Sequence, residues 1–213
     1  MCKNSTCCKG FVAGLYMPYL MLCMPCAYAD DCLQFKTSPT VEVSRPEWTR
    51  SVVQPVEPMD ALHGNVAATF EEEYNLSVAT EPLEAGYCVV LRSVRASVGY
   101  TGFLVKIDAS HMPDSCEYNM TLEHEDEHIA AHITALSGEY GNIEKAIETA
   151  ASGVMPVFAK SLDGVDAALD KMQGDLQNDP GIILMKQKLD VQQEIGNKKV
   201  DEHDGGIRIN SCK

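Results

Sequence analysis

The sequence predicts an α+β protein: a small twisted sheet, one helix packed across it, and a helical C-terminal half. Between residues 40 and 107, short apolar alternations and β-branched runs are separated by turn residues, which is the pattern of strands. From residue 115 onward, apolar residues recur every three or four positions, which is the pattern of helices. The elements follow from these two patterns in chain order.

Residues 1–29 have the pattern of an export signal. Two lysines precede an apolar run from Phe11 to Cys26, and Ala27-Tyr28-Ala29 matches a small-x-small cleavage site. The run is short for a membrane span, and two prolines interrupt it. We therefore expect residues 1–29 to be removed on export and residues 30–213 to form one domain with no stable membrane span.

The net charge is consistent with an exported protein. The chain has 17 basic and 31 acidic residues and a net charge of −14. Removing residues 1–29 takes away two basic residues and no acidic ones, which leaves −16. So negative a surface disfavours nucleic acid and anionic membranes as partners. We expect a periplasmic or secreted protein.

Four of the nine cysteines lie beyond residue 29: Cys32, Cys88, Cys116 and Cys212. An even number in an exported chain favours two disulfides, for which three pairings exist. Because Cys32 and Cys212 lie near the two ends of the mature chain, we favour a bridge between them. That choice leaves Cys88 for Cys116.

The first half of the mature chain predicts strands and a hairpin. Gly99–Gly102 reads as a hairpin turn between two strands, and Ser115 or Asp114 can cap the helix that follows. A strand delivered just before that helix could line a cleft and pair with an extended peptide. The strands that we expect are 40–43, 88–91, 93–98 and 103–107.

The functional prediction rests on the stretch Thr121–His132, in which His124, Glu125 and His128 match H-E-x-x-H. Helix residues four apart have Cβ atoms about 5–6 Å from each other. Two imidazoles so placed can each reach one zinc ion at about 2.0–2.1 Å. Glu125 then lies near the open coordination position, where it can deprotonate a metal-bound water.

Helical periodicity supports this placement. At about 100° per residue, the histidines form one stripe and the apolar residues form a second stripe beside it, with Glu125 between the two. We expect this helix to end near Ser137–Gly138. The apolar stripe consists of Tyr118, Leu122, Ile129, Ile133 and Leu136. Three further helices are expected at residues 142–152, 156–173 and 178–195.

A catalytic zinc ion usually has a third protein ligand. His132 continues the histidine stripe and is the nearest candidate. Its backbone stands about 12 Å from that of His124 on a straight helix, so sharing one ion requires a bend. The other candidates are His203, Glu144 and Glu148. The third ligand is open among these residues.

The stretch Ser115–His128 resembles the active-site region of predicted secreted zinc-dependent proteases of bacteria, whose function is largely uncharacterised. The acidic turn Asp201–Gly206 is loosely similar to a late Asp…His-Gly element of that group. The resemblance implies a zincin-like fold, zinc on His124 and His128, and a general base at Glu125. It implies no particular substrate.

Together these observations predict a zinc-dependent metallopeptidase that acts on a peptide or protein substrate outside the cytoplasm, with Zn²⁺ as cofactor. His132, His203 or Tyr118 could stabilise the oxyanion. The alternative is a non-catalytic exported protein that binds metal or serves a structural or interaction role. Its histidines would form a solvated helix face. The sequence does not indicate an oligomeric state.

Overall fold

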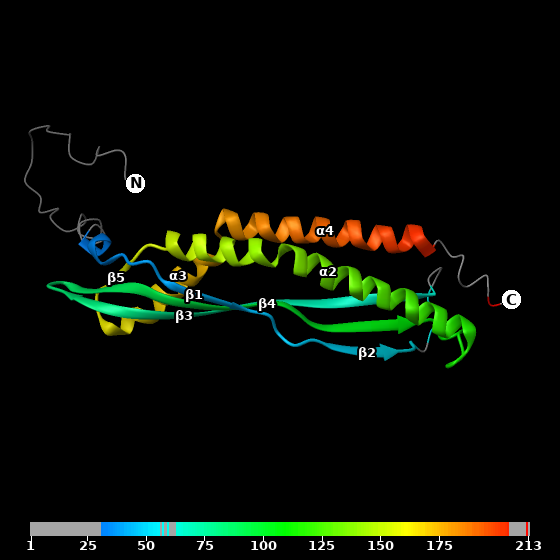
Figure 1. Ribbon diagram of the computed structural model, residues 1–213. Coiled ribbons are helices and arrows are strands. Elements are labelled where there is room, and N and C mark those ends of the chain that lie inside the picture. Colours follow the sequence, from blue (N-terminus) through cyan, green and yellow to red (C-terminus); the bar gives the residue numbers. More distant parts are fainter. Residues whose placement is uncertain (1–30, 56, 58, 60–62, 205–211, 213) are drawn as a thin grey trace, which may run out of the picture.

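The computed structural model describes residues 31–55, 57, 59, 63–204 and 212 of the 213-residue chain. The expected signal peptide lies outside the described residues. In the described part, the chain forms a five-stranded sheet and three α-helices, which confirms the α+β class. Figure 1 shows an elongated molecule in which two long helices lie along one face of the sheet.

A long antiparallel hairpin forms most of the sheet. It consists of β3 (Gly64–Leu83) and β4 (Gly86–Ile107), which pair from Leu83–Gly86 at the turn to Gly64–Ile107 at the open end. Three short strands follow one another along the other edge of β4. They are the antiparallel β5 (Val157–Ala159) and the parallel β1 (Thr40–Ser44) and β2 (Thr49–Val53).

The hairpin turn expected at Gly99–Gly102 is wrong. Thr69 pairs with Gly102 and Phe70 with Tyr100, so Thr101 is an extra residue in β4, a β-bulge, and the strand continues. Ladders on both edges outweigh the local turn signal here. Residues 102–106 of β4 pair with β2 on one edge and with β3 on the other. Because both edges are occupied, the expectation that this strand would pair with a peptide is also wrong.

One face of β4 forms the core beneath the helices. Residues at alternate positions are buried, and the bulge shifts the alternation by one residue so that the same face stays buried. They share one cluster with Ile129, Leu136, Ile143 and Ile147 of the long helix that follows. The buried residues of β4 in this cluster are Val89, Leu91, Val94, Ala96, Val98, Tyr100, Phe103, Val105 and Ile107.

The long helix α2 runs unbroken over Cys116–Gly153. Its start is as predicted, because the Ser115 side chain accepts a hydrogen bond from the Tyr118 amide at 3.1 Å. The predicted end at Ser137–Gly138 is wrong, and so is the separate helix from residue 142. Ile143 and Ile147 continue the buried stripe, and their burial outweighs the roughly 1 kcal/mol cost of a glycine in a helix.

Two further helices complete the fold. α3 covers Val165–Gln177 and α4 covers Pro180–Asp204. The helix expected from residue 156 begins later, since residues 157–159 join the sheet as β5. α4 begins at Pro180, two residues after the predicted start at residue 178, and extends past the predicted end at residue 195. It runs antiparallel to α2, so its last turns lie over the first turns of α2 (Figure 1).

Two disulfides were predicted and two are present, but the favoured pairing is wrong. Cys32 bonds to Cys88, and Cys116 bonds to Cys212, with Cα–Cα distances of 5.4 and 5.7 Å. The antiparallel arrangement of α2 and α4 is the reason. It brings the C-terminal end of α4 to the start of α2, where Cys212 meets Cys116, and leaves Cys88 near the hairpin turn for Cys32.

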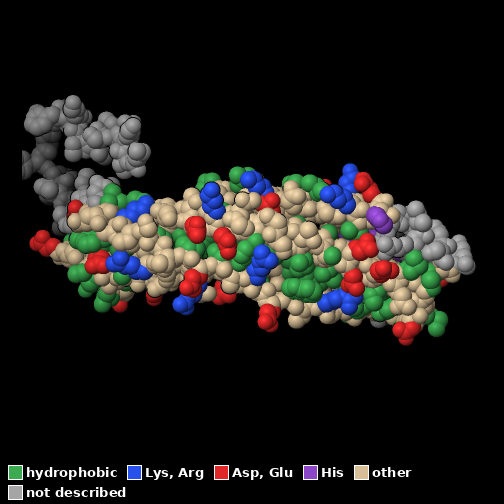
Figure 2. Space-filling model, viewed as in Figure 1, with side chains coloured by type: hydrophobic (Ala, Val, Ile, Leu, Met, Phe, Trp, Pro, Cys, Tyr) green, Lys and Arg blue, Asp and Glu red, His purple; other side chains and the backbone are tan. Residues whose placement is uncertain are grey.

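The surface of the described part gives two further observations. Figure 2 shows acidic and basic side chains interspersed along the length of one face. Among the described residues, the structure contains no helix that is long and apolar enough to cross a membrane.

Candidate metal centre

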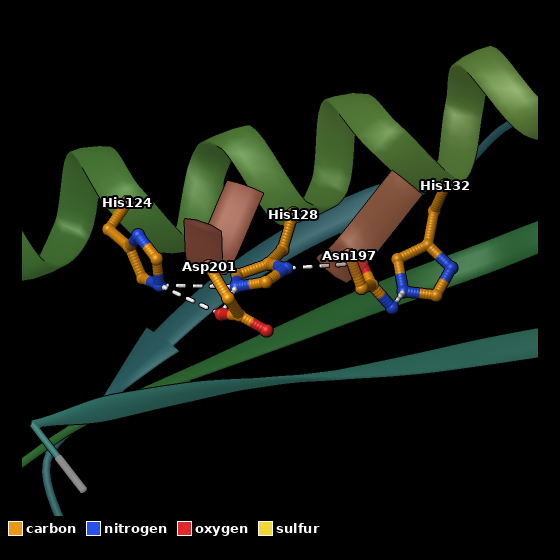
Figure 3. A network of polar contacts seen from close by, with 5 residues as sticks. All are labelled: His124, His128, His132, Asn197 and Asp201. Atoms are coloured by element: carbon orange, nitrogen blue, oxygen red, sulfur yellow. Dashed lines mark hydrogen bonds and ion pairs between the residues drawn. The ribbon is translucent and has the colours of Figure 1, made fainter. Parts of the chain in front are cut away.

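The antiparallel helices α2 and α4 bring two histidines and one carboxylate together. His124 Nε2 lies 3.1 Å from His128 Nε2 on α2. Asp201 Oδ1, from the last turn of α4, lies 3.7 Å from His124 Nε2 and 3.3 Å from His128 Nε2. Figure 3 shows the Asp201 carboxylate reaching toward both imidazoles.

These three atoms fit one zinc ion. Ligand atoms about 2.0–2.1 Å from a tetrahedral zinc stand roughly 3.3–3.4 Å from each other, and one ligand atom from each residue lies within 4.8 Å of the others. Two imidazoles and one carboxylate are also the donor set of many catalytic zinc sites. The Asp201 side chain is 64% exposed, so solvent reaches the group on the α4 side.

A close approach of the two helices holds this geometry. A Cβ atom on Gly196 would lie only 3.1 Å from the Ala131 Cβ atom, so the glycine lets α4 approach α2 beside the histidines. Ile182, Met185 and Leu189 anchor the rest of α4 in the main core. The position of Asp201 therefore follows from packing along the whole helix pair.

Asn197 orients the second histidine. Its Oδ1 lies 3.1 Å from His128 Nδ1. Because an amide oxygen can only accept a hydrogen bond, His128 carries its proton on Nδ1, which leaves Nε2 free to bind a metal. A partner of this kind on the outer nitrogen is typical of metal-binding histidines.

His132 lies outside the three-residue group. Its Nε2 is 3.5 Å from Asn197 Nδ2, and its Nδ1 is 3.1 Å from the Tyr100 hydroxyl. Burial lowers the pKa of His132, and the positive charge that His128 can carry lowers it further. A neutral His132 thus supports the amide that orients His128, while Asp201 is the residue that lies beside His124 and His128.

The other candidates are also outside the group. His203 lies two residues beyond Asp201 on α4. Glu144 stands roughly 24 Å beyond His128 along α2, at 1.5 Å per residue, and Glu148 stands farther still. Tyr118 packs against the main core, where a role as oxyanion donor has no support from the geometry.

Glu125 is buried on the sheet side of α2, with 4% of its surface exposed. Burial raises its pKa from the usual 4.5 to about 7, the positive charge that His128 can carry opposes the rise, and the negative charge of Asp201 adds to it. Gly64 makes room for the carboxyl, because a Cβ atom there would lie 2.9 Å from Glu125 Oε1. The carboxyl therefore exchanges a proton near neutral pH.

No protein-family model, curated protein or solved structure matches this chain. The site is therefore inferred from its geometry alone.

Sequence reasoning missed Asp201 and Asn197 as members of the site. A signal was present: Asp190, Asn197 and Asp201 recur at helical spacing on one side of a helix that is otherwise anchored by apolar residues. The same side borders an open depression of about 510 Å³. Its lining consists of Asp190, Gln193, Glu194, Asn197, Lys198 and Asp201.

Proposed function

We propose that this protein is an exported zinc-dependent peptidase with a zincin-like active site. The observation that carries the proposal is the convergence of Asp201 with His124 and His128, at 3.7 and 3.3 Å, from a helix far along the chain. An H-E-x-x-H pattern that arises by chance on a solvated helix has no reason to acquire a third ligand.

The roles of the residues follow from their positions. His124, His128 and Asp201 would hold the zinc ion, which supplies Lewis-acid activation of a water molecule. Glu125 would act as the general base, taking a proton from that water and passing it to the leaving amine, as the H-E-x-x-H pattern implies. Asn197 keeps His128 in the tautomer that leaves Nε2 free. The depression beside Asp201 offers room for the polypeptide.

Two observations are compatible with export. The described residues contain two disulfides, which persist in oxidising compartments. They contain no helix suited to cross a membrane. The likeness of residues 115–128 to predicted secreted zinc-dependent proteases stays a prediction.

A Glu125→Gln variant separates the peptidase from a non-catalytic metal-binding protein. We expect it to retain one zinc ion per chain, by elemental analysis, and to lose peptide hydrolysis by about 10²–10⁴-fold, the usual contribution of a general base. Glu123→Gln, an exposed position on the same helix, is the matched control and keeps activity.

Two outcomes would count against the proposal. Undiminished hydrolysis in Glu125→Gln would refute the role of that carboxyl. Zinc bound by the parent but not by His124→Ala/His128→Ala, with no cleavage of a mixed peptide library by the parent, would favour the metal-binding alternative.

A further inference from the structure

A second histidine pair lies outside the proposed active site. His63 stands directly before β3, and His111 stands in the turn between β4 and α2. His63 Nδ1 is 3.1 Å from His111 Nε2, the same separation as between His124 and His128. The ring planes differ by 23° and the centroids are 5.2 Å apart, so the rings are stacked with these two nitrogens adjacent.

The backbone holds both residues in place. The Asp108 amide donates to the His63 carbonyl at 2.9 Å, and the His111 amide donates to the Asp108 carbonyl at 3.1 Å. Gln54 Nε2 donates to the His111 carbonyl at 2.7 Å. These bonds close the open end of the β3–β4 hairpin, where Gly64 pairs with Ile107. The approach of the two imidazoles is therefore built into the backbone.

A carboxylate lies beside the pair. Asp108 is buried and accepts hydrogen bonds from the amides of Ser110 and Met59. The bonds with Ser110 and then that with Met59 lower its pKa to about 2, and the positive charge that His111 can carry lowers it slightly more. A carboxylate at this place favours a cation over an anion at the pair.

The separation of the nitrogens suits one metal ion. Two nitrogens about 2.0–2.1 Å from a shared ion stand roughly 2.9 Å apart at a right angle and roughly 3.4 Å apart at a tetrahedral angle. The observed 3.1 Å lies between these values. Without an ion, two neutral imidazoles can share only one hydrogen bond through these atoms, and two protonated ones repel each other.

We infer that His63 and His111 form a second metal site, which binds one divalent ion of the imidazole-preferring class, Cu²⁺, Ni²⁺ or Zn²⁺, with water completing the coordination. It shares no residue with the group formed by His124, His128 and Asp201. With two protein ligands instead of three, it holds its ion more weakly. By the usual order of affinities, Cu²⁺ binds it most tightly.

Copper binding in a background that lacks the first site tests this inference independently of any peptidase activity. In the full chain carrying His124→Ala/His128→Ala, Cu²⁺ alone is titrated and followed by electron paramagnetic resonance. We expect a bound ion whose spectrum shows two nitrogen ligands. Adding His63→Ala and His111→Ala should remove one ion per chain together with those nitrogen couplings. His203→Ala in the same background is the matched control and should change neither.

Copper stoichiometry and nitrogen couplings that stay the same after His63→Ala/His111→Ala would overturn the inference. A milder variant guards against misfolding: His63→Asn keeps a polar side chain and every backbone hydrogen bond of the turn. It is expected to weaken Cu²⁺ binding in this background at least about tenfold, since the loss of even an outer-shell partner of a metal-binding histidine typically costs 10–100-fold. Unchanged affinity in that variant would likewise refute the site.

Discussion

Replacing Glu125 by glutamine is expected to stabilise the metal-free protein at neutral pH. Folding raises the pKa of this carboxyl from 4.5 to about 7, chiefly by burial. Between these pH values the unfolded chain has lost a proton that the folded chain keeps, so rising pH favours unfolding. One pKa unit corresponds to about 1.4 kcal/mol, so above pH 7 this effect lowers the free energy of unfolding by at most about 3 kcal/mol. Glutamine has a similar shape and no proton to lose, so the variant escapes the penalty.

Urea unfolding of both proteins in the presence of a chelator, at intervals from pH 4 to 8, measures the effect. The difference in unfolding free energy, variant minus parent, should rise by up to about 3 kcal/mol over this range. His132 contributes in the opposite sense, because its lowered pKa makes the folded state lose stability as pH falls. That contribution is common to both proteins and cancels in the difference.

Glu123→Gln on the exposed side of α2 is the control, and it should not show the rise of up to about 3 kcal/mol that is expected for Glu125→Gln. A difference for Glu125→Gln that is equally flat would refute the buried, protonated carboxyl. It would also remove the reason for expecting a proton acceptor tuned to neutral pH beside the metal group.

Two further predictions concern what holds the metal group. Asp201→Asn should lower zinc affinity at least about tenfold in competition with a fluorescent chelator, whereas Asp190→Asn on the same helix should not; equal affinity in both would show that Asp201 is no ligand. Replacing the Cys116–Cys212 bridge by serines should lower the unfolding free energy by about 2–4 kcal/mol and weaken zinc binding, because the bridge ties the segment after α4 to the start of α2. The same change at Cys32–Cys88, near the hairpin turn, should lower stability alone, and equal zinc losses in the two variants would contradict this assignment.

Helix starts could be predicted from the sequence because the residues that signal them lie within the few residues that form them. Ser115 caps α2 as predicted, and α4 begins at Pro180, within two residues of its predicted start, because capping and the proline ring act within one helical turn. Gly99–Gly102 and Gly138 carried equally clear local signals, but long-range pairing of β4 and continued burial along α2 overrode them. A glycine indicates a permitted turn or stop, and packing decides whether it is used.

The disulfides illustrate the same limit. Composition and compartment predict that four cysteines make two bridges, yet proximity to the chain ends did not predict the partners. Cys116 meets Cys212 only because α2 and α4 are antiparallel. Distance along the chain carries little information about distance in space once two long helices pack side by side.

The sequence by itself determined one half of the candidate metal centre, because the spacing of His124 and His128 places two imidazoles one turn apart on any helix. Only the tertiary structure decided the other half. Asp201 reaches those imidazoles because Ile182, Met185 and Leu189 pack in the core and Gly196 lets α4 approach Ala131. Helix periodicity is a property of neighbouring residues, whereas the meeting of two helices depends on burial summed over the whole chain.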